Sequence, residues 1–218
     1  MKKRTIISLV LLILLTTITL GEKIVIPQFN LKKIIIENNA LIKDEDIKKL
    51  LAPYYGNNLI FLKNKEIEKA LIKNSFIDGF NIKKKYPSTL KIKIFEKKPI
   101  AVLLNKKKIF YLSDKVDYIE FDKNYDIKDL PYVFGTKEMF KILYNDLKKE
   151  DFPISSVKKF TLYESKRWDI ETIDKKTIKL PAKNYLASLR NFMNIMHKKE
   201  FKKYKVFDYR IKDQLILK

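Results

Sequence analysis

The stretch "IKKKYPSTLKIKIFEKKPIAVL", residues 82–103, decides the fold of the first half of the chain. Beyond Pro87-Ser88 the residues of one parity are apolar and those of the other are basic: Leu90, Ile92 and Ile94 against Lys91 and Lys93. Before it, Phe80, Ile82 and Tyr86 share a parity, with Lys84 as a misfit near the strand end. Period-two alternation broken by a turn dipeptide is typical of a β-hairpin. We therefore expect most of these lysines on the solvent face of a sheet.

One strand and two helices are predicted ahead of this hairpin. The strand is expected over 31–36, and the first helix over 43–56, with acidic residues in its first turn. Residues 57–62 are expected to be extended, and a second helix over 63–74 is expected to be capped by Asn64. The inward residues of the second helix are expected to be Ile67, Leu71 and Ile72. The order β-α-α-β-β predicts a small domain over 30–96, with both helices on one face of its sheet.

After Pro99 the sequence changes to short apolar runs separated by polar turns. Strands are expected over 100–104, 108–112, 116–121, 156–163, 167–174, 176–180, 205–211 and 214–218. Helices are expected over 136–150 and 181–200, the second opened by Pro181. The prediction is a β-rich α+β domain over 97–218 with two helices, which makes the whole chain α+β.

The N-terminus carries a membrane-targeting signal. Three basic residues, Lys2 to Arg4, precede a run without charge from Ile6 to Leu20. We expect a signal-anchor transmembrane helix over 5–26, with residues 1–4 in the cytoplasm and the bulk of the chain outside. The alternative is a cleaved signal peptide, although "TITLGE" lacks small residues at the usual cleavage spacing.

Composition excludes several classes of site. The chain has no cysteine, one histidine (His197) and four isolated glycines, so thiolate, multi-histidine metal and phosphate-loop sites are not expected. The net charge is +21, but only four of the 47 basic residues are arginines, which argues against nucleic-acid recognition. The acidic clusters at 43–46 and 149–152 lie at expected helix ends, so an exported cell-wall hydrolase is a weak alternative. No catalytic residue, cofactor or metal is predicted.

The ordered motifs resemble the bacterial cell-division family FtsQ/DivIB. The run 82–103 is similar to the family pattern W-P-x-T-L-x-I-x-I-x-E-[RK]-x-P-x-A, with Tyr86 in place of Trp. The matching positions are Pro87, Thr89, Leu90, Ile92, Ile94, Glu96, Pro99 and Ala101. Later landmarks are "LPYVFG" at 130–135, "RWDI" around Trp168 and "FDYR" at 207–210. The glycines usual in two later turns are absent at "SDKVDY" and at Lys175-Lys176.

This resemblance implies that residues 30–96 are a POTRA (polypeptide-transport-associated) domain in a non-enzymatic scaffold of the division septum. Such a scaffold is a single-pass protein of the inner membrane, and it binds division proteins of the FtsB/DivIC and FtsL type. A partner strand is expected to add to an exposed edge near the C-terminus. The expected partner-binding residues are Phe207, Tyr209, Gln214, Leu215, Ile216 and Leu217. Asp208 and Arg210 are expected to form a structural ion pair or a strand-to-loop bond rather than a contact site. The alternative function is a POTRA-containing protein-export or outer-membrane assembly factor.

Overall fold

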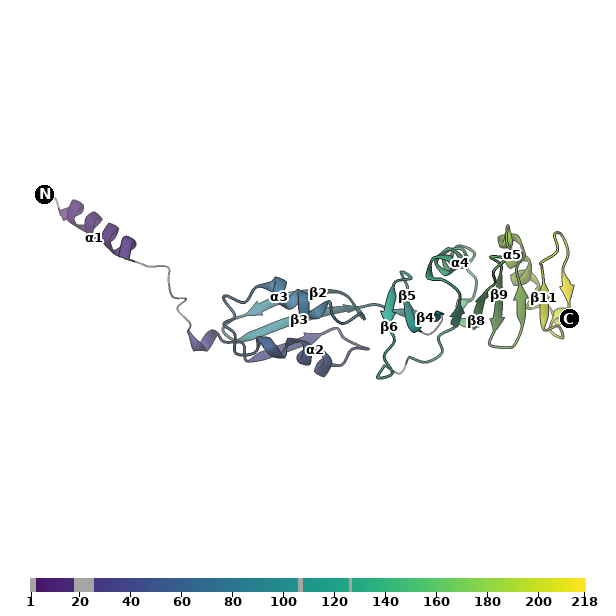
Figure 1. Cartoon of the computed structure of the whole chain (residues 1–218), viewed down its shortest axis with the longest axis horizontal. Coiled ribbons are helices and arrows are strands. Elements are labelled where there is room, and N and C mark those ends of the chain that lie inside the picture. The colour runs from purple at the N-terminus through teal and green to yellow at the C-terminus, as the bar shows by residue number, and fades with distance from the viewer. Residues whose placement is uncertain (1–2, 18–25, 106–107, 126) are drawn as a thin grey trace.

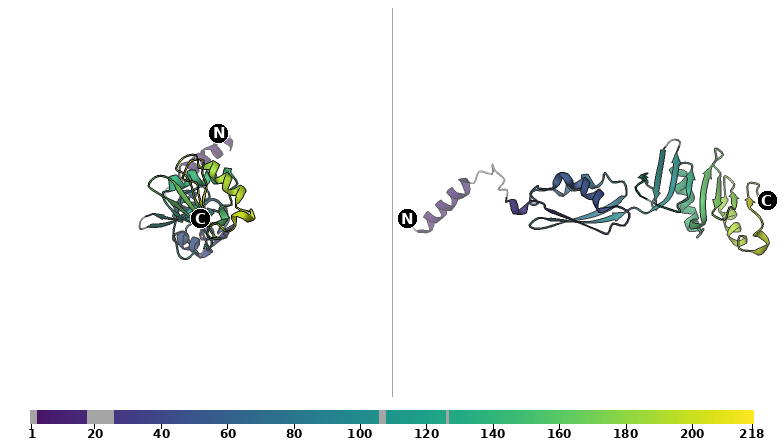
Figure 2. Two further views of the ribbon diagram at one scale, coloured as in Figure 1. Left: turned by 90° about the vertical axis from the view of Figure 1, so that its right-hand side faces the viewer. Right: turned by 90° about the horizontal axis from the view of Figure 1, so that it is seen from below.

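The computed structural model describes residues 3–17, 26–105, 108–125 and 127–218. From residue 26 onward the chain is arranged along one long axis, with the C-terminus at the far end (Figure 1). Two sheets account for this arrangement, one of three strands and one of nine. Figure 2 shows both sheets from two further directions. The α+β class expected from the sequence is confirmed.

Helix α1 spans Lys3–Thr17. Its aliphatic side chains, from Ile6 to Leu15, each keep more than half of their surface exposed. Of the span expected over 5–26, residues 18–25 lie outside the described part of the chain. Within the described residues, no helix has both the length and the apolar character needed to cross a bilayer.

The three-stranded sheet has the order β1-β3-β2, with β1 parallel to β3 and β2 antiparallel to it. The bounds are β1 Lys33–Glu37, α2 Asp44–Leu51, α3 Asn64–Leu71, β2 Ile77–Lys85 and β3 Thr89–Glu96. The hairpin expected at Pro87-Ser88 is confirmed, and its register pairs Ile82 with Ile92. The parity prediction also holds, because Leu90, Ile92 and Ile94 are fully buried beneath α2 and α3.

Four details of this unit differ from the sequence prediction. Residues 57–62 form turns rather than an extended run, because the amide groups of Phe61 and Leu62 donate to the Asn58 carbonyl. Asn64 is the first residue of α3, whose N-cap is Lys63. Ile72 follows the helix and is 68% exposed. Tyr86 lies beyond the end of β2, where the strand parity no longer applies, and is 57% exposed.

The nine-stranded sheet has the order β12-β11-β10-β9-β8-β7-β4-β5-β6. Its strands are β4 Pro99–Asn105, β5 Lys108–Ser113, β6 Tyr118–Glu120, β7 Tyr132–Phe134, β8 Val157–Leu162, β9 Trp168–Thr172, β10 Thr177–Lys179, β11 Val206–Asp208 and β12 Ile216–Leu217. Its helices are α4 Lys137–Lys149 and α5 Tyr185–Ile195. Both helices pack into one core with the sheet, and they lie on the same side of it in Figure 1.

Two boundaries in this unit were predicted wrongly. Pro181 does not open the last helix, because Asn184 takes a left-handed conformation as the N-cap and α5 begins one residue later. The two C-terminal strands are much shorter than the ranges 205–211 and 214–218. A turn over 209–215 that includes Asp213 at a φ of 58° separates them.

The two sheets share apolar core where they meet. Tyr111 and Tyr125 belong to the second unit, yet they are buried in the core of the first. Their rings lie 6.0 and 4.3 Å from the ring of Phe76. Val102 and Ile119 extend the same cluster. Separating the units would expose this apolar surface to water, so the contact favours a fixed relative orientation.

Candidate partner-binding edge

The C-terminal strand β12 lies at one edge of the nine-stranded sheet. It pairs antiparallel with β11, with Phe207 opposite Leu217. Val206 and Lys218 exchange backbone hydrogen bonds of 2.9 and 3.1 Å. Because hydrogen-bonded pairs alternate along an antiparallel ladder, the N–H and C=O groups of Leu217 point away from β11. Among the described residues no strand lies on that side, so these groups form a free edge.

An ion pair between the buried Asp208 and the exposed Arg210 holds the end of β11. Asp208 is 5% exposed, and its carboxylate accepts bonds of 2.8 and 2.6 Å from Nε and Nη2 of Arg210. The backbone N–H of Arg210 also donates to the same carboxylate. The Arg210 hydrogen bond lowers the pKa of Asp208. The structural ion pair expected from the sequence is confirmed, and it fixes the start of the turn that leads to β12.

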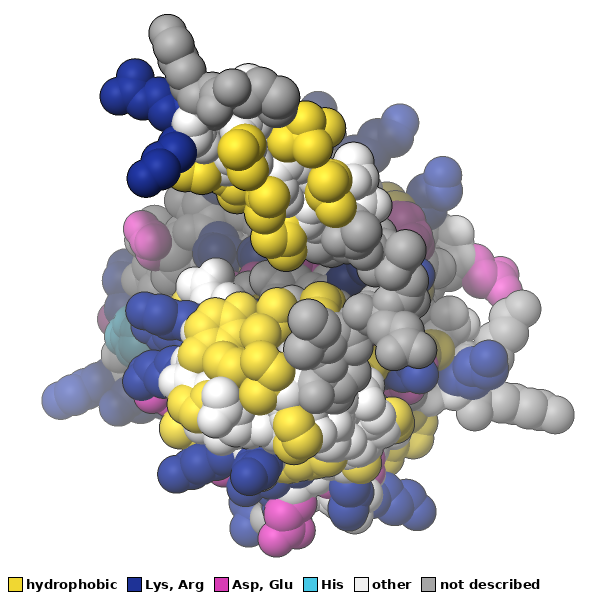
Figure 3. Space-filling model, turned by 90° about the vertical axis from the view of Figure 1, so that its left-hand side faces the viewer, with side chains coloured by type: hydrophobic (Ala, Val, Ile, Leu, Met, Phe, Trp, Pro, Cys, Tyr) yellow, Lys and Arg dark blue, Asp and Glu magenta, His cyan; other side chains and the backbone are white. Residues whose placement is uncertain are grey.

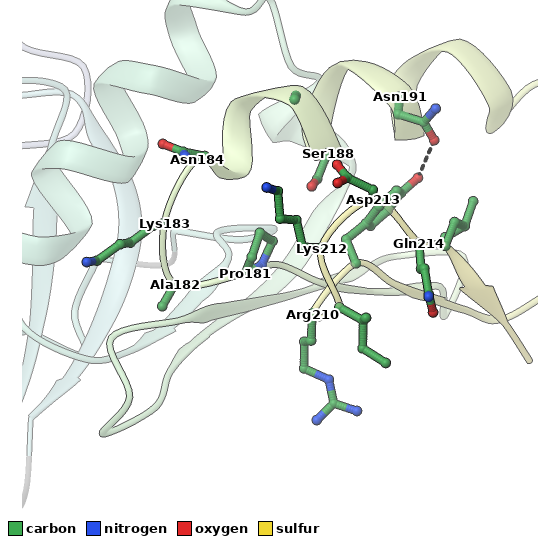
Figure 4. Close-up of a pocket in the computed structure, with 14 residues that line it drawn as sticks. Pro181, Ala182, Lys183, Asn184, Ser188, Asn191, Arg210, Lys212, Asp213 and Gln214 are labelled. Atoms are coloured by element: carbon green, nitrogen blue, oxygen red, sulfur yellow. Dashed lines mark hydrogen bonds between the residues drawn. The ribbon is translucent and has the colours of Figure 1, made fainter.

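The 209–215 turn is also tied to α5. The hydroxyl of Tyr209 donates to Oδ1 of Asn191 at 2.9 Å. Burial raises the pKa of the Tyr209 phenol, so it stays a neutral donor at ordinary pH. A groove of about 750 Å³ lies between α5 and this turn (Figure 4). The groove reaches Gln214 and Leu215, the two residues before β12, and its lining includes Lys183, Arg210 and Lys212.

The six residues expected to bind a partner take two kinds of position. Phe207 and Tyr209 are buried, with Phe207 packed 5.0 Å from the ring of Phe192, so they support the edge from inside. Gln214 and Leu215 line the groove. Ile216 is 37% exposed, and Leu217 is partly buried against the core. Tyr209 also reaches the groove lining, so five of the six lie at the groove or on β12, and Phe207 is buried beneath them.

Sequence reasoning did not identify the α5 side of the groove. Asn184, Ser188 and Asn191 line it from the helix. Their spacing of four and three residues places them on one helix face. Any polar helix surface shows this spacing. The groove could therefore be predicted only from the position of the 209–215 turn opposite α5.

Comparison with known proteins identifies the family. A family model described as a POTRA domain of FtsQ type matches residues 29–97. The chain is 30% identical over 193 residues to the cell division protein FtsQ of Rickettsia bellii, which covers 85% of this chain and 71% of that protein. The chain belongs to the FtsQ/DivIB family. The FtsQ of Rickettsia conorii is 29% identical over the same shares of each chain.

DivIB proteins give shorter matches. The cell division protein DivIB of Clostridium acetobutylicum is 28% identical over 99 residues, covering 45% of this chain and 36% of that protein. The extracytoplasmic domain of DivIB from Geobacillus stearothermophilus is a solved structure with a TM-score of 0.34 and 10% identity, covering 49% of this chain and 91% of that domain. The family resemblance stated from the sequence motifs is confirmed by the similarity to FtsQ over 85% of the chain.

Proposed function

We propose that this protein is a non-enzymatic scaffold of the bacterial division septum. It captures other single-span division proteins, of the FtsB/DivIC and FtsL type, partly by accepting a strand on β12. Membership of the FtsQ/DivIB family supports the division role. The free edge of β12, and the groove that ends at the residues just before this strand, support the mode of binding.

The backbone of β12 carries this proposal. An incoming strand would pair with the N–H and C=O of Leu217, and its alternate side chains would meet the groove. The charge of Arg210 is paired with Asp208, and Lys183 and Lys212 outnumber Asp213 in the groove lining, so acidic partner residues are favoured there.

We further propose that α1 belongs to a signal-anchor in the cytoplasmic membrane, with residues 1–4 in the cytoplasm. Two observations support this. The aliphatic side chains of α1 have no described protein surface covering them, and basic residues precede the helix. The edge at β12 would then lie outside the cytoplasm.

The test is a pair of substitutions at one position. Leu217→Pro removes the outward N–H without removing a ladder bond to β11, whereas Leu217→Ala keeps that N–H and shortens only the side chain. Full-length protein is purified in mild detergent, and co-purifying FtsL-type and FtsB/DivIC-type proteins are measured by mass spectrometry. We expect Leu217→Pro to reduce capture roughly tenfold or more, since at least one intermolecular backbone hydrogen bond and its neighbours are lost.

Leu217→Ala is expected to reduce capture much less. Unchanged thermal unfolding of the proline variant confirms that the fold is intact. Equal capture by the two variants would contradict strand addition at β12.

A further inference from the structure

A second exposed surface lies at the opposite end of the described body. Three segments, residues 26–31, 55–62 and 84–88, meet there and form the proximal tip. The Leu59 N–H donates to the Phe29 carbonyl at 2.8 Å, and the Gly56 N–H donates to the Leu31 carbonyl at 3.0 Å. The rings of Phe29 and Tyr86 lie 6.1 Å apart. The tip is therefore a joined surface of the three-stranded unit, and residue 26 is where the chain arrives from α1.

The proximal tip exposes large apolar side chains. The most exposed are Ile26 at 41%, Tyr55 at 39%, Ile60 at 45%, Phe61 at 43% and Tyr86 at 57%. Figure 3 shows apolar side chains gathered at this end of the molecule, with lysines around them. The turn at 58–62 produces part of this exposure, because it buries Leu59 and Leu62 while directing the two residues between them outward. The three segments contain no acidic residue.

A face of lysines continues from the tip along the outer side of the sheet. The register places Lys85, Thr89 and Lys33 in one row, Lys83, Lys91 and Ile35 in the next, and Asn81, Lys93 and Glu37 in the third. Lys83 lies directly opposite Lys91, a like-charge pair that destabilises an isolated sheet. Within the part of the chain that the structure describes, Lys91 alone among these lysines forms an ion pair, with Glu37 at 2.6 Å. A negative surface alongside would compensate the remaining charge.

We propose that the proximal tip and this lysine face dock onto the anionic surface of the membrane that α1 enters. Tyr and Phe side chains are favoured at the bilayer interface, and lysines extend from apolar surroundings toward anionic headgroups. The tip begins nine residues after α1 ends at Thr17, and a chain of that length spans at most about 30 Å. The tip is therefore kept within reach of the headgroups. This inference rests on the proposed anchoring by α1.

The absence of cysteine allows a direct test. Ile60→Cys introduces a unique thiol at the tip, and Ile142→Cys introduces one at a similarly exposed isoleucine on α4. Each full-length variant is labelled with an environment-sensitive fluorophore. It is then reconstituted into vesicles of phosphatidylcholine and phosphatidylglycerol that contain a headgroup nitroxide lipid. We expect quenching and a blue shift for the label at 60 and neither for the label at 142.

A charge variant tests the lysine contribution. Lys83→Glu with Lys85→Glu, in the Ile60→Cys chain, is expected to weaken docking about fivefold or more per lysine in phosphatidylglycerol vesicles. The same change is expected to have little effect in phosphatidylcholine alone. Circular dichroism confirms that the variant is folded.

The outcomes separate this inference from the proposed function. If the protein fails to float with vesicles, anchoring and docking are both wrong. If it floats while the label at 60 is quenched no more than the label at 142, only docking is wrong. Self-association through the tip would give crosslinks between Ile60→Cys chains in place of lipid quenching, and it would also overturn the proposal.

Discussion

The two sheets of this protein present different parts of the chain to their surroundings. The three-stranded sheet offers side chains, namely an apolar tip and a lysine face on two long strands. The nine-stranded sheet offers backbone at β12, a strand of two residues supported by buried neighbours. A surface that binds through side chains depends on those exposed side chains themselves. A backbone edge depends instead on the buried core that holds its strand in place. The difference therefore predicts where substitutions change folding and where they change only contact.

The largest expected effect is loss of the support beneath β12. Phe207→Ala removes a ring with no exposed surface, packed against Phe192. Such substitutions cost about 3–5 kcal/mol of unfolding free energy. Ile60→Ala at the proximal tip is expected to change stability by less than about 0.5 kcal/mol. Urea unfolding of both variants measures the contrast, and similar values would contradict it.

Glu96 gives the next largest effect, in the three-stranded unit. Its carboxylate accepts hydrogen bonds from the backbone N–H groups of Ala40, Leu41 and Ile42, the shortest to each at 3.0, 2.9 and 2.8 Å. Glu96→Ala leaves these donors without that acceptor and is expected to destabilise the protein by about 2–3 kcal/mol. Glu96→Gln keeps one acceptor oxygen, so thermal unfolding should place it between wild type and alanine. If the alanine variant is as stable as wild type, the carboxylate does not hold this turn.

A turn in the nine-stranded unit should gain stability from glycine. Lys175 has a φ of 64°, a conformation that strains a side chain but not glycine. Lys175→Gly is expected to stabilise the protein by up to about 1 kcal/mol. The matched control is Lys141→Gly on the exposed face of α4, which is expected to destabilise it by about 1 kcal/mol. Chemical denaturation distinguishes the two signs.

The smallest effect is a pH dependence at the end of β11. Arg210 lowers the folded-state pKa of Asp208, so this pair stabilises the fold fully above the ordinary carboxyl pKa of about 4. The stabilisation is lost as pH falls through the lower, folded-state pKa. The melting-temperature difference between wild type and Asp208→Asn should therefore shrink between about pH 6 and about pH 3. A difference that stays constant over this range would contradict the assignment.

The sequence predicted the hairpin of the first sheet well because β2 and β3 are long enough for parity to repeat. It predicted the second sheet less accurately, since strands such as β10 and β11 have three residues each. Some strands of this sheet are bounded by turns in which ordinary residues take left-handed conformations, such as Val116 between β5 and β6 and Lys175 between β9 and β10. These are the two turns where the glycines of the family pattern are missing. The residue types present there do not predict a left-handed conformation.

The family motifs identified which residues matter in this chain, but they did not show which contacts those residues make. Gly135 and Trp168 were separate landmarks in the sequence, but a Cβ on Gly135 would lie 3.0 Å from Cη2 of Trp168. Glu96 matched the family pattern, and only the fold shows the three amides it accepts. The position of β12 at an edge also came from the resemblance, because alternation does not distinguish an edge strand from an interior one. The groove depended on the 209–215 turn, which was expected to be mostly strand.

The shared core around Phe76, Tyr111 and Tyr125 has a mechanical consequence. Because the two units are joined by packed side chains rather than by a loose linker, they are expected to move as one strut. One end of that strut is the point where the chain arrives from α1, and the other carries β12 (Figure 1). The length of the strut is therefore fixed. It fixes the distance between the point where the chain arrives from α1 and β12, so the proposed anchor and the proposed partner edge would be held at a constant separation.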